Sequence, residues 1–320
     1  MPRPMTDFSP VPVPSNAHNL GTYTNERNLL PLYLQRYDRP NTITSYLNDL
    51  VDFFGSDYVN LHQAQQITFI QVNDYLAGLQ AQGLKPSTMK RRVAAIRGFF
   101  DWLMALGVIE QNPAHRQLLR RIPTARQSDR SIVYLTTEQA EQLLNATEQA
   151  GRASVRDRAL LLVLLHCVLR RSEAAAMDAL HIRPLGHYWV LDLPMTKGGA
   201  DQYVKIPAHV VEAVDSMKDH YGFDSGPLWR SLSNNNKDGR LTPNSIYLIV
   251  RRTAQRAGLS EAIGAHTLRH TGCTLALEAG ASLQQVQTHA RHKNIETTMR
   301  YLHQRDKLRD SAADYIRVKR

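Results

Sequence analysis

HTLRHTGCTLALEAGASLQQVQTHARHKNIETTMRY, residues 266–301, is the part of this 320-residue chain whose spacing is the most informative. His266 and Arg269 stand three residues apart, so they share one face of a predicted helix. His292 follows on what the pattern predicts as a second short helix, and Tyr301 comes nine residues after it. Two imidazoles, a guanidinium and a phenol are suited to holding a phosphate and attacking it.

A second arginine site lies upstream, in DRALLLVLLHCVLRRSEAAAM, residues 157–177. The run from Leu160 to Leu165 is apolar on every side, which predicts a helix buried in the centre of a domain. Buried Arg and Glu side chains are almost never left unpaired, because an isolated buried charge is very costly. Arg170 and Glu173 therefore form either a structural ion pair or a phosphate-binding guanidinium that a carboxylate orients.

Both segments resemble the active-site motifs of the tyrosine recombinase (phage integrase) family. Its patterns are G-L-R-x-S-E, here VLRRSE, then H-x-x-R, and a His or Trp nine residues before a nucleophilic Tyr. The resemblance implies a site-specific recombinase that cuts and rejoins DNA through a transient 3′-phosphotyrosyl intermediate, for integration, excision, resolution or inversion. A recombinase of this family needs neither a metal nor a cofactor for this reaction. The implied catalytic residues, with Glu173 accessory and Tyr301 the nucleophile, are Arg170, Lys197, His266, Arg269, His292, Tyr301 and Glu173.

The lysine of this set comes from HYWVLDLPMTKGGADQYVKIP, residues 187–207. Apolar and polar residues alternate on both sides of its TKGG turn, which predicts a β-hairpin. A lysine at a hairpin tip is usually a solubilising charge. In the family the lysine of this turn enters the active site, so the resemblance implies Lys197, with Lys205 in the second strand as the runner-up.

The chain departs from the family pattern at two places. The usual Gly of the first motif is Val168, a change that concerns the backbone turn more than the chemistry, and Arg171 fills the motif's variable position. The usual L-G-H is Ala290-Arg291-His292, where a long cation replaces a flexible Gly. The runner-up for the role of His292 is His289.

Composition favours a two-domain intracellular protein with a polyanionic partner. The chain carries a formal charge of +10 and is 42% hydrophobic, and its two cysteines show no C-x-x-C spacing. It lacks a secretion signal and an apolar run long enough to span a membrane, so we expect it in the cytoplasm, associated with the bacterial nucleoid. Nucleic acid is the usual partner of such a basic protein, although a solvated basic surface is the alternative.

We predict a mainly α fold with a small β-sheet (α+β). A flexible arm, residues 1–20, precedes an N-terminal helical bundle of about four helices, residues 21–115, which resembles the family's SAM-like core-binding domain. An arginine-rich linker, residues 116–133, leads to a catalytic domain, residues 134–320, that ends in a tail helix, 305–318. The resemblance implies that the two domains form a clamp around DNA.

Two predicted helices carry arginines beside their apolar stripes. One begins at Pro86, and the other begins with Thr242 as cap and Pro243 at its first position. Their basic residues are either a solvated face or DNA contacts: Lys90, Arg91, Arg92, Arg97, Arg251, Arg252 and Arg256.

The implied partner is double-stranded DNA with an inverted-repeat core site, bound by a dimer per site and a tetramer in synapsis. A directionality factor is a further partner that the sequence does not identify. The tail, in which Leu308, Ala312, Tyr315 and Ile316 fall at helical spacing, docks either on its own domain or on a neighbouring subunit.

Three other functions compete with this prediction. The cluster of His266, His270, His289, His292 and His303 raises a metal-dependent hydrolase, but the chain has no H-E-x-x-H and no Cys ligand pattern. A type IB topoisomerase-like relaxing enzyme would share the tyrosine chemistry. A non-catalytic DNA-binding regulator could use the same fold, although every expected catalytic position is filled here.

Overall fold

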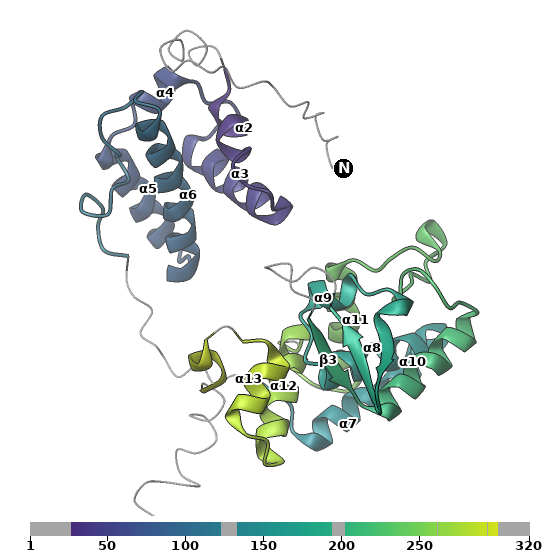
Figure 1. The fold of residues 1–320 in the computed structure, drawn as a ribbon. Helices are drawn as coiled ribbons and strands as arrows, with labels where there is room; N and C mark the ends of the chain where they lie inside the picture. The colour runs from purple at the N-terminus through teal and green to yellow at the C-terminus, as the bar shows by residue number, and fades with distance from the viewer. Residues whose placement is uncertain (1–26, 123–132, 194–201, 261, 293, 300–320) are drawn as a thin grey trace, which may run out of the picture. The chain divides into compact units, whose positions relative to one another are not determined.

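The structure is a computed structural model, and it describes residues 27–122, 133–193, 202–260, 262–292 and 294–299. The chain divides into two compact units, Met1–Asp129 and Arg130–Arg320 (Figure 1). The division falls inside the segment predicted as a linker. The predicted fold class is confirmed, because the described residues are mainly helical with one small antiparallel sheet. None of the described helices is both long and apolar enough to cross a membrane.

The N-terminal unit is a helical bundle. Its described part contains five α-helices, where the sequence predicts about four: α2 (Leu29–Leu34), α3 (Pro40–Phe54), α4 (Leu61–Gln65), α5 (Phe69–Ala81) and α6 (Pro86–Ala105). Both α3 and α6 begin with Pro at the first turn, where its missing N–H costs nothing. Phe99 of α6 lies at the centre of the core and meets Tyr33 and Phe54 edge-on, with ring centres 5.5 Å apart in each case.

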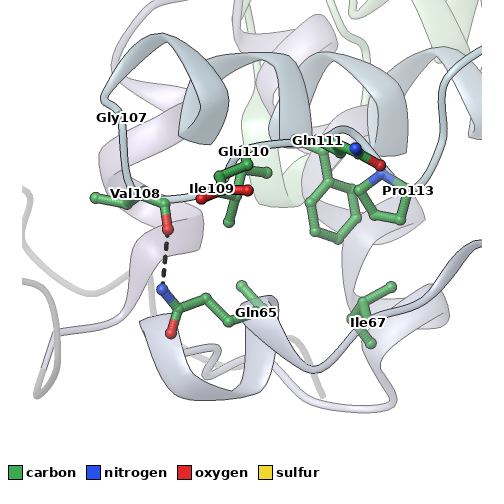
Figure 2. A pocket seen from close by; sticks show the side chains of 10 residues that line it. Gln65, Ile67, Gly107, Val108, Ile109, Glu110, Gln111 and Pro113 are labelled. Atoms are coloured by element: carbon green, nitrogen blue, oxygen red, sulfur yellow. Dashed lines mark hydrogen bonds between the residues drawn. The ribbon is translucent and has the colours of Figure 1, made fainter.

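A pocket of about 470 Å³ opens in this unit between α4 and the loop after α6 (Figure 2). Gln65 donates a hydrogen bond to the Val108 carbonyl at 2.9 Å, and Ile67 and Pro113 line the opposite end. The pocket belongs to the bundle and is no part of the arginine site described below.

The second unit is built around a largely buried helix, α8. In chain order its helical elements are α7 (Thr137–Asn145), η2 (Ala146–Ala153), α8 (Ser154–His166), α9 (Arg171–Ala175), η3 (Ala179–His181), α10 (Ala208–Tyr221), η4 (Asn234–Asn236), α11 (Pro243–Arg256), α12 (Ala265–Glu278) and α13 (Leu283–Ala290). Helix α8 is buried from Leu160 to Leu164 and packs on α10 and α12, so its predicted central position is confirmed. Thr242 caps α11 as predicted, and Thr136 caps α7.

A three-stranded antiparallel sheet completes this unit, in the order β1 (Ile182–Leu185), β2 (Tyr188–Asp192), β3 (Tyr203–Ile206). Strands β2 and β3 are the two sides of the predicted hairpin, and the turn between them lies outside the described residues. The sequence did not predict β1. Its Pro184 is tolerated because β1 is an edge strand, where a missing N–H breaks no ladder on the open side.

Candidate active site

The turn from α8 into α9 places Arg170 and Glu173. Arg170 is the N-cap residue of α9, and its backbone N–H donates to Glu173 Oε2 at 2.8 Å. Its guanidinium Nη1 donates to Glu173 Oε1 at 2.5 Å, so one carboxylate fixes both the backbone and the side chain of Arg170. The Arg170 side chain is still 49% exposed, which leaves guanidinium N–H groups accessible to a phosphate.

Val168 shapes the same turn. Its φ is +44°, a left-handed conformation that a β-branched residue rarely adopts. The Val168 carbonyl accepts hydrogen bonds from two guanidiniums, those of Arg269 and Arg291. The position where the family has Gly therefore keeps a glycine-like backbone here, and its peptide group becomes part of the arginine site.

Arg269 lies on α12 and is only 2% exposed. Nη1 donates to the Val168 carbonyl and Nη2 to the Ala290 carbonyl, so the side chain ties the α8–α9 turn to the end of α13. Burial, followed by the charges of Arg170 and Arg291, lowers the pKa of Arg269 to about 10, which keeps it charged at neutral pH. These two bonds use two of the five N–H groups of a guanidinium, so donors remain for a phosphate.

His266 lies three residues before Arg269 on α12, as predicted, with its ring centre 4.2 Å from that of His270. Burial lowers the pKa of His266, and the charges of Arg269 and Arg170 lower it further. The imidazole is therefore neutral at pH 7 and can accept a proton from a phenol.

His292 does not lie on a second helix, and this part of the prediction was wrong. Helix α13 ends at Ala290, and Arg291 adopts a left-handed conformation with φ +55°, which turns the chain away from the helix axis. The His292 N–H then donates to the Gln287 carbonyl at 3.1 Å. Burial, followed by Arg269, Arg170 and Arg291, lowers the pKa of His292 to about 4, so its imidazole is neutral.

Thr298 sets the orientation of the His292 ring, and the sequence did not single it out. It is fully buried in the helical residues 295–299, and its Oγ1 lies 2.9 Å from His292 Nδ1. With the hydroxyl as donor, the neutral imidazole carries its proton on Nε2, the tautomer that can donate to a phosphate oxygen. The runner-up, His289, instead donates its Nε2–H to the His166 carbonyl at 2.7 Å.

Two family models match the chain. The phage integrase family model covers residues 133–307, and the phage integrase N-terminal SAM-like domain covers residues 29–107. Tyrosine recombinase XerC of Pelobacter propionicus is 31% identical over 278 residues, which cover 87% of this chain and 86% of the relative. The chain belongs to the phage integrase family. Like its relatives it is a site-specific tyrosine recombinase that breaks and rejoins DNA, so the recombinase prediction is confirmed over the relaxing enzyme, the regulator and the hydrolase.

Two solved recombinase structures share the fold. XerH bound to a palindromic difH substrate after cleavage aligns with a TM-score of 0.67 at 21% identity, covering 86% of this chain and 79% of that one. The lambda integrase tetramer bound to a Holliday junction aligns with a TM-score of 0.64 at 17% identity, covering 88% of this chain and 80% of that one.

Two residues that the recombinase motifs imply, Lys197 and Tyr301, lie outside the described residues. Strands β2 and β3 flank the segment that holds Lys197, and the described helical residues 295–299 precede Tyr301 in the chain. Lys205, the runner-up for the lysine, is exposed on β3, with its ammonium 4.6 Å from the centre of the Tyr188 ring.

Three of the arginines proposed for DNA contact in the N-terminal unit make internal bonds. Arg91 pairs with Asp49, a carboxylate of α3 that is only 3% exposed. Arg92 pairs with Asp52 and Tyr75, and Arg97 donates to the Ala114 carbonyl at 3.0 Å. These bonds hold α6 against its neighbours, so a DNA phosphate that bound these arginines would compete with their internal partners. Lys90 is exposed, as Arg91 is.

On α11 of the recombinase domain, Arg252 and Arg256 are exposed and Arg251 is half-buried. Contact between these three residues and DNA stays a prediction. Across the described part of both units, no three or more His, Cys, Asp and Glu side chains are grouped so that they could hold a metal ion.

Proposed function

We propose that Arg170 and Arg269 hold the scissile phosphate of DNA while Tyr301 attacks it. The observation that carries this proposal is the joint anchoring of the two guanidiniums. Glu173 fixes Arg170, the Val168 carbonyl accepts from Arg269, and the turn from Val168 to Glu173 supplies both anchors. Two guanidinium groups, each donating paired hydrogen bonds to one phosphate, neutralise its charge and stabilise the pentacoordinate transition state. An ammonium group cannot donate hydrogen bonds in the same paired geometry.

The neutral histidines supply the other groups that the reaction needs. His266 accepts the phenol proton of Tyr301, and the tyrosine oxygen forms a bond to phosphorus. The bond between phosphorus and the 5′ oxygen breaks, and Lys197 gives that oxygen a proton. His292 donates a hydrogen bond to a phosphate oxygen. The products are a 3′-phosphotyrosyl link and a free 5′ hydroxyl, and attack by a 5′ hydroxyl from another strand reverses the steps and rejoins the DNA.

A nicked suicide substrate tests the nucleophile, because loss of a short 5′ fragment traps the covalent adduct. Tyr301→Phe should bind DNA with unchanged affinity and form no adduct, since only the attacking oxygen is removed. Tyr315→Phe is the matched control and should form the adduct normally. An adduct in the Tyr301→Phe protein that disappears in the Tyr315→Phe protein would move the nucleophile to the tail.

A sulfur-substituted substrate tests Lys197 as the general acid. Lys197→Ala should slow cleavage of normal DNA far more than cleavage of DNA with sulfur as the 5′ bridging atom, because a thiolate leaves without a proton. Lys205→Ala, a substitution in the flanking strand, should slow both substrates equally or not at all. The same selective rescue in the Lys205 variant would assign the acid to Lys205 instead.

For the partner, we propose double-stranded DNA with inverted repeats, bound by a dimer at each core site and a tetramer in synapsis, with the two units clamped around it in the cytoplasm. The palindromic substrate of XerH and the lambda integrase tetramer support this proposal. The tail would dock on a neighbouring subunit. Deletion of residues 306–320 should then preserve binding to one site and abolish assembly on DNA with two sites, whereas normal assembly would mean that the tail docks on its own subunit.

A further inference from the structure

Arg291 occupies a place in the backbone that arginine seldom takes. It is the C-cap residue of α13, with φ +55° and ψ +44°, in the left-handed region. Helices that end in this conformation usually have Gly there, because a side chain costs about 1–2 kcal/mol. An arginine at such a position indicates that its side chain makes contacts that offset the strain.

The Arg291 guanidinium is buried and binds three acceptors. The side chain is 9% exposed, and Nη2 donates to Glu173 Oε2 at 2.8 Å and to the Val168 carbonyl at 3.4 Å. Nη1 donates to the His289 carbonyl at 2.8 Å. Nε is buried and has no hydrogen-bond partner among the described residues. A cation buried this deeply is stable only while its carboxylate stays ionised.

Two of those acceptors also anchor the proposed phosphate ligands. Glu173 binds Arg170 through its backbone and its side chain, and the Val168 carbonyl binds Arg269. Arg291 therefore touches the anchor of each phosphate arginine without occupying the exposed side of Arg170. A shift of Glu173 would move Arg170, and a shift of the Val168 peptide would move Arg269.

We propose that Arg291 is a positioning residue that bridges Glu173 and the Val168 carbonyl and so holds Arg170 and Arg269 in the geometry that binds the scissile phosphate. The proposal rests on the phosphate-binding role assigned to these two arginines. It also gives the replacement of Gly by Arg at this position a chemical reason.

The charge balance around Glu173 provides a signature of this role. Burial by itself would raise the pKa of Glu173, but Arg291 and then Arg170 outweigh it and lower the pKa. The charged groups that act on this carboxylate are Arg170 at the start of α9, Arg291 at the end of α13 and, more weakly, Arg269 of α12. Without the charge of Arg291, the effect of burial is less opposed and the pKa of Glu173 rises. Glu173 then takes up a proton as the pH falls.

The experiment is single-turnover cleavage of a suicide substrate by the full-length chain, from pH 5.5 to 8.5, with Arg291→Met and Arg291→Lys. At pH 8 the Met variant should be slower by about 10-fold to 100-fold, the loss expected when a catalytic group is displaced. This deficit should grow as the pH falls, because a protonated Glu173 releases Arg170. Lysine keeps the positive charge beside Glu173 but cannot make the forked hydrogen bonds of a guanidinium. Arg291→Lys should therefore have a lower cleavage rate with the pH profile of the unmodified enzyme.

Two controls separate positioning from folding. Arg156 is another buried arginine of this unit, paired with Asp157, and Arg156→Met should show no pH-dependent loss of cleavage. In a Glu173→Gln background nothing titrates at position 173, so the effect of Arg291→Met should become independent of pH. If the Met variant does not fold, the Lys variant and its profile still test the proposal.

A cleavage deficit of the Arg291→Met variant that is equal at every pH, or one that keeps its pH dependence in the Glu173→Gln background, would overturn the positioning role. So would an Arg291→Lys variant that cleaves at the unmodified rate or whose deficit changes with pH. Failure of the underlying assignment would look different. In that case Arg170→Ala and Arg269→Ala would cleave at the unmodified rate, whatever the Arg291 variants do.

Discussion

Replacing Val168 by Gly and by Ala is expected to reverse the usual stability order of these two residues. The φ of +44° is free of strain only for Gly, so the Gly variant should be the more stable of the two. Both variants lose the buried valine side chain, and the comparison between them therefore isolates the backbone.

The size of the effect follows from the conformation. Alanine in the left-handed region costs about 1–2 kcal/mol, and glycine costs about 0.5–1 kcal/mol through the extra entropy of the unfolded chain. The Gly variant at 168 should thus be more stable than the Ala variant by roughly 0.5–1 kcal/mol. Val163 is the matched control, because it is fully buried in the regular part of α8, where Gly should be about 1 kcal/mol less stable than Ala.

The assay is equilibrium unfolding in urea, followed by tryptophan fluorescence in a Trp102→Phe background. The remaining tryptophans, Trp189 and Trp229, both lie in the second unit, so the signal reports the unit that contains Val168. If Ala is more stable than Gly at 168 by the same margin as at 163, the left-handed turn does not exist. The hydrogen bonds from Arg269 and Arg291 to the Val168 carbonyl would then be wrong as well.

Further predictions concern packing, protonation, metal and DNA. Gly272→Ala should destabilise the second unit by about 1–3 kcal/mol in urea unfolding, because the added Cβ would collide with the backbone carbonyl of Leu165. Val168→Ala should not restore the lost stability, and restored stability would contradict the clash with the Leu165 carbonyl. In DNA-free protein His292 should titrate near pH 4 by NMR, since burial and three arginines disfavour the imidazolium, and a midpoint above 6 would refute this environment. Strand cleavage should survive excess EDTA, because guanidiniums neutralise the phosphate, whereas loss that zinc or magnesium restores would be contrary evidence. Arg252→Ala should reduce the salt slope of DNA binding by about one unit, with exposed Arg158 as the control, and an unchanged slope would place Arg252 in solvent.

Local patterns were enough to predict most of the fold. An apolar run with no polar face predicts a central helix, and α8 is one. Cap residues predict helix starts, as Thr242 does for α11. Strand β1 was missed because Pro184 argues against a strand unless its position at the edge of the sheet is known, and that position depends on pairing with β2.

The site was predictable where chemistry follows spacing along one element. His266 and Arg269 share α12, and Arg170 and Glu173 share one helical turn. Long-range contacts were not predictable. Arg91 is bound to Asp49, 42 positions away, so the sequence could not distinguish it from a free surface charge.

The end of α13 shows the same limit at short range. The sequence marked Arg291 as unusual, yet its carboxylate partner Glu173 lies 118 positions away in the chain. Nor does any periodic pattern connect His292 to Thr298. Arg291, in the left-handed conformation, separates both residues from α13 and breaks the helical spacing.

In the proposed reaction, strand transfer proceeds through Tyr301 at a phosphate held by Arg170 and Arg269. Mass spectrometry of the adduct trapped on a suicide substrate, after nuclease and protease digestion, tests it most directly. We expect a nucleotide attached through its 3′ phosphate to the peptide that contains Tyr301, at the phenol oxygen. A nucleotide on Tyr315, on any other residue, or linked through a 5′ phosphate would contradict it.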